Sequence, residues 1–306
     1  MNFDFMGRRK LWLIVSLSVI AIGIVSLAVQ GLNFGIDFTG GTRMHLNLPG
    51  GFTIEELRSV LGDIEAQDAS GRTVTLDGSF IQPVLGADGP EVIIRTVPLS
   101  EDERVTVLAA IENHWPQFSG EDLLNLENVG PVVGGELIRN ALWALVLASA
   151  ALIAYISYRF QFKFAIAALV ALLFDAFVLI AAFSIFQVEM NSPFVAVVLT
   201  IIGYSINDTI VVFDRVRENL KATPSDKLLE QTVNTSINQT LVRSLSTSFT
   251  TLLVVGSLLF LGGETIRPFS LPLFIGIFSG TYSSIFVASP VWLTWRQREK
   301  KQRSGR

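Results

Sequence analysis

The stretch FVAVVLTIIGYSINDTIVVFDRVREN, residues 194–219, decides how this chain must fold. Residues 194–213 are apolar enough and long enough to cross the roughly 30 Å hydrocarbon core of a bilayer as a helix. Yet Asn207 and Asp208 lie inside that span. A charged side chain at the centre of a membrane helix costs at least about 2.5 kcal/mol, so such residues are rare and usually functional. The sequence therefore predicts a membrane helix that carries a functional carboxylate.

The composition extends this interpretation to the whole chain. Of the 306 residues, 50% are hydrophobic and only 16% are charged, which is unlike a soluble globular protein. Five further apolar runs count as spans, because the loops that join most of them are too short for anything else. The six predicted spans are residues 11–29, 142–158, 164–186, 194–213, 243–261 and 269–295. The predicted fold class is a polytopic α-helical membrane protein with six transmembrane helices.

Positive charge predicts the orientation of the spans, since Lys and Arg gather in cytoplasmic loops. They precede span one, join spans two and three, join spans four and five, and end the chain in a basic tail at residues 296–306. Both termini are therefore expected to be cytoplasmic. Residues 1–30 would hold the N-terminus and span one, whose apolar core is long for a cleaved signal peptide and favours an uncleaved anchor. Spans two to six would occupy residues 136–295.

Residues 31–135 have the pattern of a small extracytoplasmic domain. Strand-like runs at residues 42–48, 72–76, 80–85, 91–96 and 122–128 surround two amphipathic helices. The order β-α-β-β-(β)-α-β predicts a ferredoxin-like α+β domain between spans one and two. Both helices open with a capping box, since Glu56 follows Thr53 by three residues and Glu103 follows Ser100 likewise. Sixteen acidic and five basic residues in this range argue against nucleic-acid binding.

Enzymatic chemistry finds no support in the sequence. There is no cysteine, and the two histidines, His45 and His114, lie far apart in sequence, so no metal site is predicted. The glycine-rich GIDFTGGT, residues 35–42, lacks the spacing of a dinucleotide-binding loop and favours a close approach of backbones. We expect no nucleophile–base pair and no cofactor other than an ion gradient.

On a helix, Asn207 and Asp208 fall on one stripe with Thr200, Gly203/Tyr204 and Val211. Small and polar residues on such a stripe face other helices or a wet cavity. Two interpretations stay open: Asp208 is a protonatable group on an ion path, or the pair only hydrogen-bonds neighbouring helices. Protons and sodium ions would both suit the carboxylate.

Span five offers a partner for this carboxylate. Arg243 and Thr247 share one helix face, with Ser244 and Ser248 beside it. Arg243 is either an anchor that snorkels to the interface or a cation that approaches Asp208. Because arginine keeps its proton, it would position and bias the carboxylate without relaying protons.

Two more features of the spans bear on function. Asp175 is isolated in span three and fits a structural hydrogen bond as well as a second station on the ion path. Gly276 and Gly280 form a GxxxG pattern in span six, which predicts close helix packing.

Four parts of the chain together resemble one family. They are GIDFTGGT at residues 35–42, VGPVVGGEL at 129–137, GYSINDTIVVFDRVREN at 203–219, and QTLVRS at 239–244 with GTYSSIFVASP at 280–290. With the layout of one span, a domain and five more spans, they look like the SecF family, accessory subunits of bacterial Sec protein export.

The resemblance implies partners and an energy source. Members pair with SecD in a bundle similar to resistance-nodulation-division transporters, and associate with the SecYEG channel and YajC. They use the proton-motive force to promote preprotein translocation and release outside the inner membrane, so residues 31–135 would be periplasmic. The resemblance also implies that Asp208 and Arg243 take part in proton flow. In one departure, Phe174 stands where the family commonly has His, so no role for Asp175 is implied.

Two alternatives remain beside this interpretation. The chain could be half of a proton-driven small-molecule or lipid efflux transporter, or a scaffold without an ion path. The partners found in a pull-down separate efflux from export. A charge-neutral substitution of Asp208 separates the scaffold from both.

Overall fold

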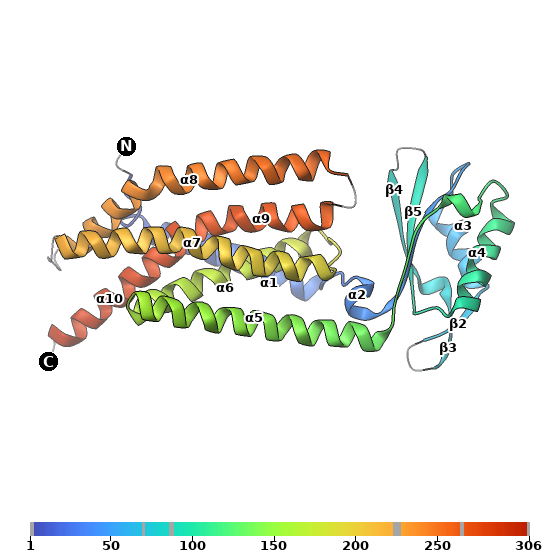
Figure 1. Ribbon diagram of the computed structural model, residues 1–306, viewed down its shortest axis with the longest axis horizontal. Helices are drawn as coiled ribbons and strands as arrows, with labels where there is room; N and C mark the ends of the chain where they lie inside the picture. The colour runs from blue at the N-terminus through green and yellow to red at the C-terminus, as the bar shows by residue number, and fades with distance from the viewer. Residues whose placement is uncertain (1–2, 69–70, 86–88, 223–227, 264–265, 305–306) are drawn as a thin grey trace. The chain divides into compact units, whose positions relative to one another are not determined.

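The computed structural model describes residues 3–68, 71–85, 89–222, 228–263 and 266–304, and most of their elements are labelled in Figure 1. The chain divides into two compact units. The membrane unit holds the residues up to Asn33 and those from Leu142 onward, and the outer unit is Phe34–Ala141. The outer unit thus begins three residues after the predicted bound of 31 and ends six residues after 135, where it includes the first turns of the helix that follows.

The membrane unit is helical throughout its long segments. Six helical segments of the described chain are long and apolar enough to cross a membrane, which confirms the six predicted spans. The helices are α1 (Arg9–Val29), α5 (Pro131–Arg159), α6 (Phe162–Ile185), α7 (Ser192–Ala222), α8 (Leu229–Leu261), α9 (Arg267–Ser283) and α10 (Ser289–Ser304), with a π-helical segment, Ser284–Ala288, between the last two.

Several helices are longer than the spans predicted for them. Helix α7 runs nine residues past 213, α8 begins fourteen residues before 243, and α5 begins eleven residues before 142. The helix that was expected to end at residue 295 continues to Ser304, so the basic tail is helical where it is described. The predictions counted only apolar residues, whereas a helix of 33 residues is about 50 Å long and extends beyond the hydrocarbon with polar turns.

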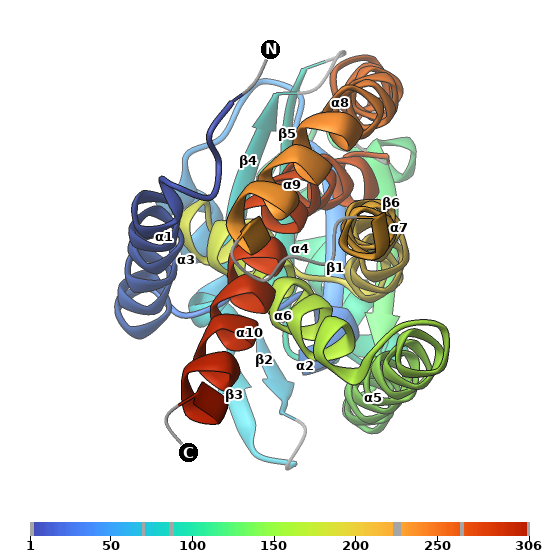
Figure 2. The same ribbon diagram turned by 90° about the vertical axis from the view of Figure 1, so that its left-hand side faces the viewer.

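Helix α9 packs against α6, α7 and α8 (Figure 2). The approach to α7 depends on two glycines, since a Cβ at Gly276 would lie 1.9 Å from Ile201 and one at Gly280 would lie 2.9 Å from the Cβ of Ser205. The π-helical segment follows directly, and Pro290 lacks the N–H that would extend a regular helix there. By contrast, α5 leaves most of its apolar surface uncovered by the described residues.

The residues before α1 fasten that helix to the start of α8. The side-chain oxygen of Asn234 accepts hydrogen bonds from the backbone N–H groups of Phe5 (2.7 Å) and Met6 (3.3 Å). Arg9 forms an ion pair of 2.7 Å with Glu230. These contacts hold the ends of α1 and α8 together at the basic end of the unit.

The outer unit contains a four-stranded antiparallel sheet in the order β4-β5-β1-β6. Its elements are α2 (Ile36–Thr39), β1 (Gly41–Asn47), α3 (Ile54–Gly62), β2 (Glu65–Gln67), β3 (Thr73–Thr75), β4 (Phe80–Leu85), β5 (Pro90–Thr96), α4 (Glu101–His114) and β6 (Leu123–Val129), with short 3₁₀ turns at Leu76–Gly78 and Gly120–Asp122. In chain order, the sheet strands and the helices α3 and α4 give β-α-β-β-α-β, which confirms the ferredoxin-like prediction. The extra strand at 72–76 belongs to a separate β2–β3 pair.

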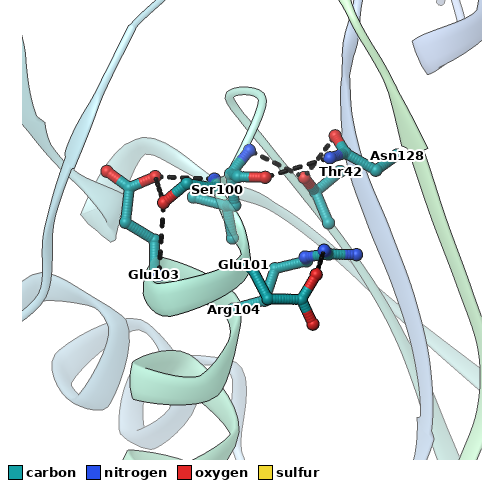
Figure 3. A network of polar contacts seen from close by, with 7 residues as sticks. Thr42, Ser100, Glu101, Glu103, Arg104 and Asn128 are labelled. Atoms are coloured by element: carbon teal, nitrogen blue, oxygen red, sulfur yellow. Dashed lines mark hydrogen bonds and ion pairs between the residues drawn. The ribbon is translucent and has the colours of Figure 1, made fainter.

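Helices α3 and α4 begin where the sequence predicts. Thr53 accepts a hydrogen bond from the N–H of Glu56 and Glu56 accepts one from Thr53, so the capping box is complete. The second box joins Ser100 and Glu103 in the same way (Figure 3). Leu57 and Leu61 of α3, with Val107 and Ile111 of α4, pack with the sheet residues into one buried core.

The motif GIDFTGGT fixes the start of the sheet. Gly41 has φ +142°, and a Cβ there would lie 2.5 Å from the carbonyl oxygen of Thr96, so only glycine fits. The next residue, Thr42, donates to Asn128 (3.0 Å) and accepts from the N–H of Leu99 (2.9 Å) (Figure 3). One hydroxyl thereby ties β1 to β6 and to the residues that precede α4.

Candidate ion-translocation site

Asp208 lies in the middle of α7 and is only 4% exposed. The hydroxyl of Ser248 on α8 donates to its Oδ2 atom at 3.4 Å, and Thr281 on α9 donates to the Ser248 hydroxyl at 2.7 Å. The carboxylate therefore faces the junction of three helices. This surrounding of hydroxyl groups can accept or donate a hydrogen bond in either protonation state of Asp208, since hydroxyl hydrogens rotate.

The inward face of α8 is lined with serines. Ser244 and Ser248 are 2% and 3% exposed, one turn apart. The Ser244 hydroxyl is buried beside the Asp208 carboxylate and can donate to it, although the contact in this structure falls short of full hydrogen-bond geometry. Ser244 and Ser248 thus present two hydroxyl groups to the same carboxylate, and both can reorient when its protonation state changes.

Arg243 and Thr247 lie on the outward face of α8 and are exposed in this chain. No ion pair joins Arg243 to Asp208 among the contacts of the described residues, although the guanidinium is close enough to act on the carboxylate electrostatically. The Thr247 hydroxyl donates to the carbonyl of Arg243 at 2.9 Å, which anchors it to its own helix. The structure thus brings Arg243 near Asp208 and leaves Thr247 apart from it.

The structure divides the stripe that the sequence predicts on α7. Asp208 is buried and Tyr204 reaches across to Thr251 of α8 at 3.4 Å, whereas Asn207 and Gly203 are exposed. Adjacent residues on a helix point about 100° apart, so one of the Asn-Asp pair faces the bundle and the other faces away. Asn207 therefore does not join Asp208 in the buried network.

Asp175 is the centre of a second buried network. It is 1% exposed and accepts hydrogen bonds from three hydroxyls: those of Ser205 (2.6 Å), Ser279 (2.6 Å) and Ser283 (2.7 Å). The donors come from α7 and α9, so the carboxylate joins three helices. Asp175 is thus the shared acceptor of three buried hydroxyl groups.

Phe174 takes part in aromatic packing beside this second network. Its ring lies 5.9 Å from that of Tyr282, whose hydroxyl is 3.0 Å from the hydroxyl of Ser16 on α1. The position therefore joins α6, α9 and α1 through packing.

Helix α9 contacts the networks of both carboxylates. Ser279 and Ser283 point to Asp175, while Thr281 points to the side of Ser248 and Asp208. A shift of α9 along its axis or about it would therefore change both sets of hydrogen bonds together.

A polar clasp joins the end of α7 to α8, two turns from the buried carboxylate. The side-chain oxygen of Gln239 accepts from Arg215 (2.7 Å) and from Asn219 (2.8 Å), and Asn219 also donates to Ser236 (2.9 Å). Gln239 lies one turn before Arg243 on the same helix, so the clasp limits how α8 can rotate beside α7.

Sequence reasoning missed the hydroxyl groups that complete both sites. Ser205, Ser279 and Ser283 were absent from the expected site, and so was Thr281. A signal was present, since Ser279 and Ser283 stand four residues apart in an apolar helix and thus share one face. The clasp residues were also missed, because they lie beyond the apolar stretch that defined the span.

Six membrane helices, a ferredoxin-like domain between the first two and carboxylates buried at helix junctions define a polytopic membrane transport protein. The family model described as "Protein export membrane protein SecD/SecF, C-terminal" matches residues 114–298, and "SecD/SecF GG Motif" matches residues 25–46. The chain belongs to the SecD/SecF family of protein-export membrane proteins, whose members are non-enzymatic translocase subunits, and its role lies in Sec protein translocation.

Individual relatives agree with this assignment. Protein translocase subunit SecF of Desulfurispirillum indicum is 42% identical over 304 residues, which cover 96% of this chain and 92% of that protein. Protein translocase subunit SecDF of Bacillus subtilis is 40% identical over 306 residues, covering 99% of this chain and 40% of that protein. The crystal structure of SecDF from Thermus thermophilus superimposes with a TM-score of 0.82 at 36% identity, over 97% of this chain and 39% of that one. The chain thus spans about two fifths of its SecDF relatives and nearly all of its SecF relative.

Proposed function

We propose that this chain couples ion flow across the membrane to the movement of exported polypeptides, and that Asp208 is the group that binds and releases the ion. The basic loops favour cytoplasmic termini and an outer unit on the extracytoplasmic side of a bacterial inner membrane. The partners are SecD, the SecYEG channel, YajC and the preprotein. The names of the relatives favour protein export over small-molecule efflux.

The buried position of Asp208 carries this proposal. A membrane protein avoids such a group unless it has a use, because even a neutralised or hydrogen-bonded carboxylate in hydrocarbon is unfavourable. Ser248 and Thr281 form a hydroxyl chain that reaches the carboxylate from one side, and the Ser244 hydroxyl, one turn from Ser248, lies beside the same carboxylate. These groups can rearrange when the ion arrives, whereas a fixed cation partner would hold one charge state.

The exposed polar face beside the site supports a partnership with SecD. Asn207 and Gly203 of α7, with Arg243 and Thr247 of α8, are exposed in this chain within otherwise apolar spans. Lipid is a poor neighbour for an amide and a guanidinium, so another protein subunit should cover them. Two relatives named SecDF match this chain over two fifths of their length, and the remainder of a SecDF chain is the natural source of that cover.

The driving force is sufficient for mechanical work. One elementary charge that crosses a membrane potential of 100 mV releases about 2.3 kcal/mol. Binding of the ion at Asp208 would alter the hydrogen bonds that join α7, α8 and α9, and so bias the arrangement of the bundle. The outer unit would then move against the emerging polypeptide.

The substitution Asp208→Asn tests the proposal in cells depleted of the native protein. We expect export of a labelled preprotein, followed by pulse-chase, to stall while the variant still inserts and co-purifies with SecD. The matched control is Asp214→Asn, which removes the same charge from an exposed position on the same helix. Normal export by Asp208→Asn would contradict the proposal and favour a scaffold. The rate of export, measured after dissipation of the proton gradient and separately after removal of sodium, then identifies the ion.

A further inference from the structure

A groove of about 630 Å³ lies at the basic end of the membrane unit, between α1, the start of α6 and α10. It is separate from both carboxylate networks. Leu13 of α1, Lys163 of α6 and Arg298 of α10 are among its lining residues. Nothing in the proposed ion path uses this groove, so its lining calls for an explanation of its own.

The lining changes in character along α10 in the way that a membrane interface does. Val291, Trp295, Arg298 and Gln302 lie three or four residues apart and therefore share one face of the helix, and all four line the groove. The face runs from aliphatic through aromatic to cationic and polar over about 16 Å. Trp at the level of lipid head groups and Arg just beyond it is the usual arrangement at the edge of a bilayer.

Among the described residues that line the groove, one cation has no ion-pair partner. Lys163 forms an ion pair with Glu299, which balances both charges. Arg298 is exposed and makes no ion pair within the part of the chain that the structure describes. A guanidinium presents parallel N–H groups that match two oxygens of a phosphate. The side chain of Arg298 is therefore suited to bind a phosphate group.

We propose that this groove binds an anionic phospholipid, with its phosphate at Arg298 and its acyl chains along Leu13, Pro290 and Val291. Two observations select a lipid over other occupants. The cationic end complements the phosphate, and the apolar end continues onto the surface of spans that face hydrocarbon. Basic grooves between membrane helices at the cytoplasmic side are known to bind anionic head groups. The lipid would pin α10 against α1 and α6.

Native mass spectrometry of the full chain in detergent tests the proposal with dioleoyl phosphatidylglycerol as the probe. We expect Arg298→Gln to weaken the binding of one lipid molecule about tenfold, because a charge-assisted phosphate contact is lost. Arg298→Lys, which keeps the charge, should restore part of the affinity. The matched control is Lys221→Gln, which removes one exposed positive charge at the same end of the unit and outside the groove.

Three outcomes would overturn the proposal. The first is equal affinity of Arg298→Gln and the unaltered chain for phosphatidylglycerol. The second is equal affinity for phosphatidylcholine with the same acyl chains, which would show that the negative charge of the lipid does not contribute to binding. The third is competition by free glycerol phosphate at matched concentration, which would identify a soluble phosphate site in place of a lipid site. Unchanged thermal stability of Arg298→Gln would confirm that the variant is folded.

Discussion

Asp175 and Ser205, on the neighbouring helices α6 and α7, are joined by a buried hydrogen bond of 2.6 Å. Ser279 and Ser283 of α9 complete the contact with the same carboxylate. One acceptor thus holds three helices together. Variants of Asp175 can show whether this residue is structural or part of the ion path.

Asp175→Ala should lower the stability of the membrane unit. The substitution leaves three buried hydroxyls without their shared acceptor, and we expect a loss of about 3 kcal/mol in the free energy of unfolding. Thermal unfolding of the purified chain measures this loss of stability, with Asp214→Ala as the exposed control. An unchanged melting temperature would show that the network contributes nothing to the fold. A stable Asp175→Asn chain that fails in export would instead assign Asp175 to the ion path.

Gly280→Val should disrupt the packing of α9 on α7. The side chain would meet Ser205, whose Cβ lies 2.9 Å and whose Cα lies 3.4 Å from the added Cβ, and a helix backbone cannot move aside easily. Overpacking of this kind costs about 1–3 kcal/mol. Gly203→Val on α7 is the matched control, because nothing lies within 4 Å of its added Cβ. Equal melting temperatures of the two variants would contradict the prediction.

The sequence predicts most of this fold because its signals are local. Apolar length identifies the six spans, and the capping boxes at Thr53 and Ser100 place two helix starts. The helix ends beyond the apolar stretches, such as residues 214–222 of α7, were not predicted, because hydropathy does not distinguish an amphipathic turn from a loop.

The candidate site was harder to predict than the fold. Asp208 stands out as a charge in an apolar span, and its selection needs no structure. Its partners come from other helices: Ser248 is 40 residues away and Thr281 is 73 residues away in the chain. Inside a bilayer, lipid-facing and helix-facing residues are equally apolar, so periodicity could not tell that Asn207 faces outward while Asp208 faces inward.

Acid should loosen α4 of the outer unit through Glu103. Hydrogen bonds from the backbone and side chain of Ser100 lower the pKa of this carboxyl below its usual value. A carboxyl whose pKa is lower in the folded chain adds stability above its ordinary pKa, and the contribution is lost as the pH falls through the folded value. The protection factors of the α4 amides, which compare exchange with the intrinsic rate at the same pH, should therefore fall more between pH 6 and pH 3 in the full chain than they do in Glu103→Gln. Glu112→Gln, exposed on the same helix, should behave like the unaltered chain.

Gln239→Ala should impair export without preventing assembly. The change removes the acceptor that Arg215 and Asn219 share, so the end of α7 loses both of its contacts one turn from Arg243 and keeps the Asn219–Ser236 hydrogen bond of the clasp. We expect preprotein export to slow by about three- to tenfold, as the loss of about 0.6–1.4 kcal/mol in a positioning contact would produce. Gln231→Ala, exposed two turns earlier on the same helix, is the control. Gln239→Glu, which keeps an acceptor for both donors, should retain most of the activity. Export at the normal rate by Gln239→Ala, or equal defects in Gln239→Ala and Gln231→Ala, would show that the clasp does not position Arg243.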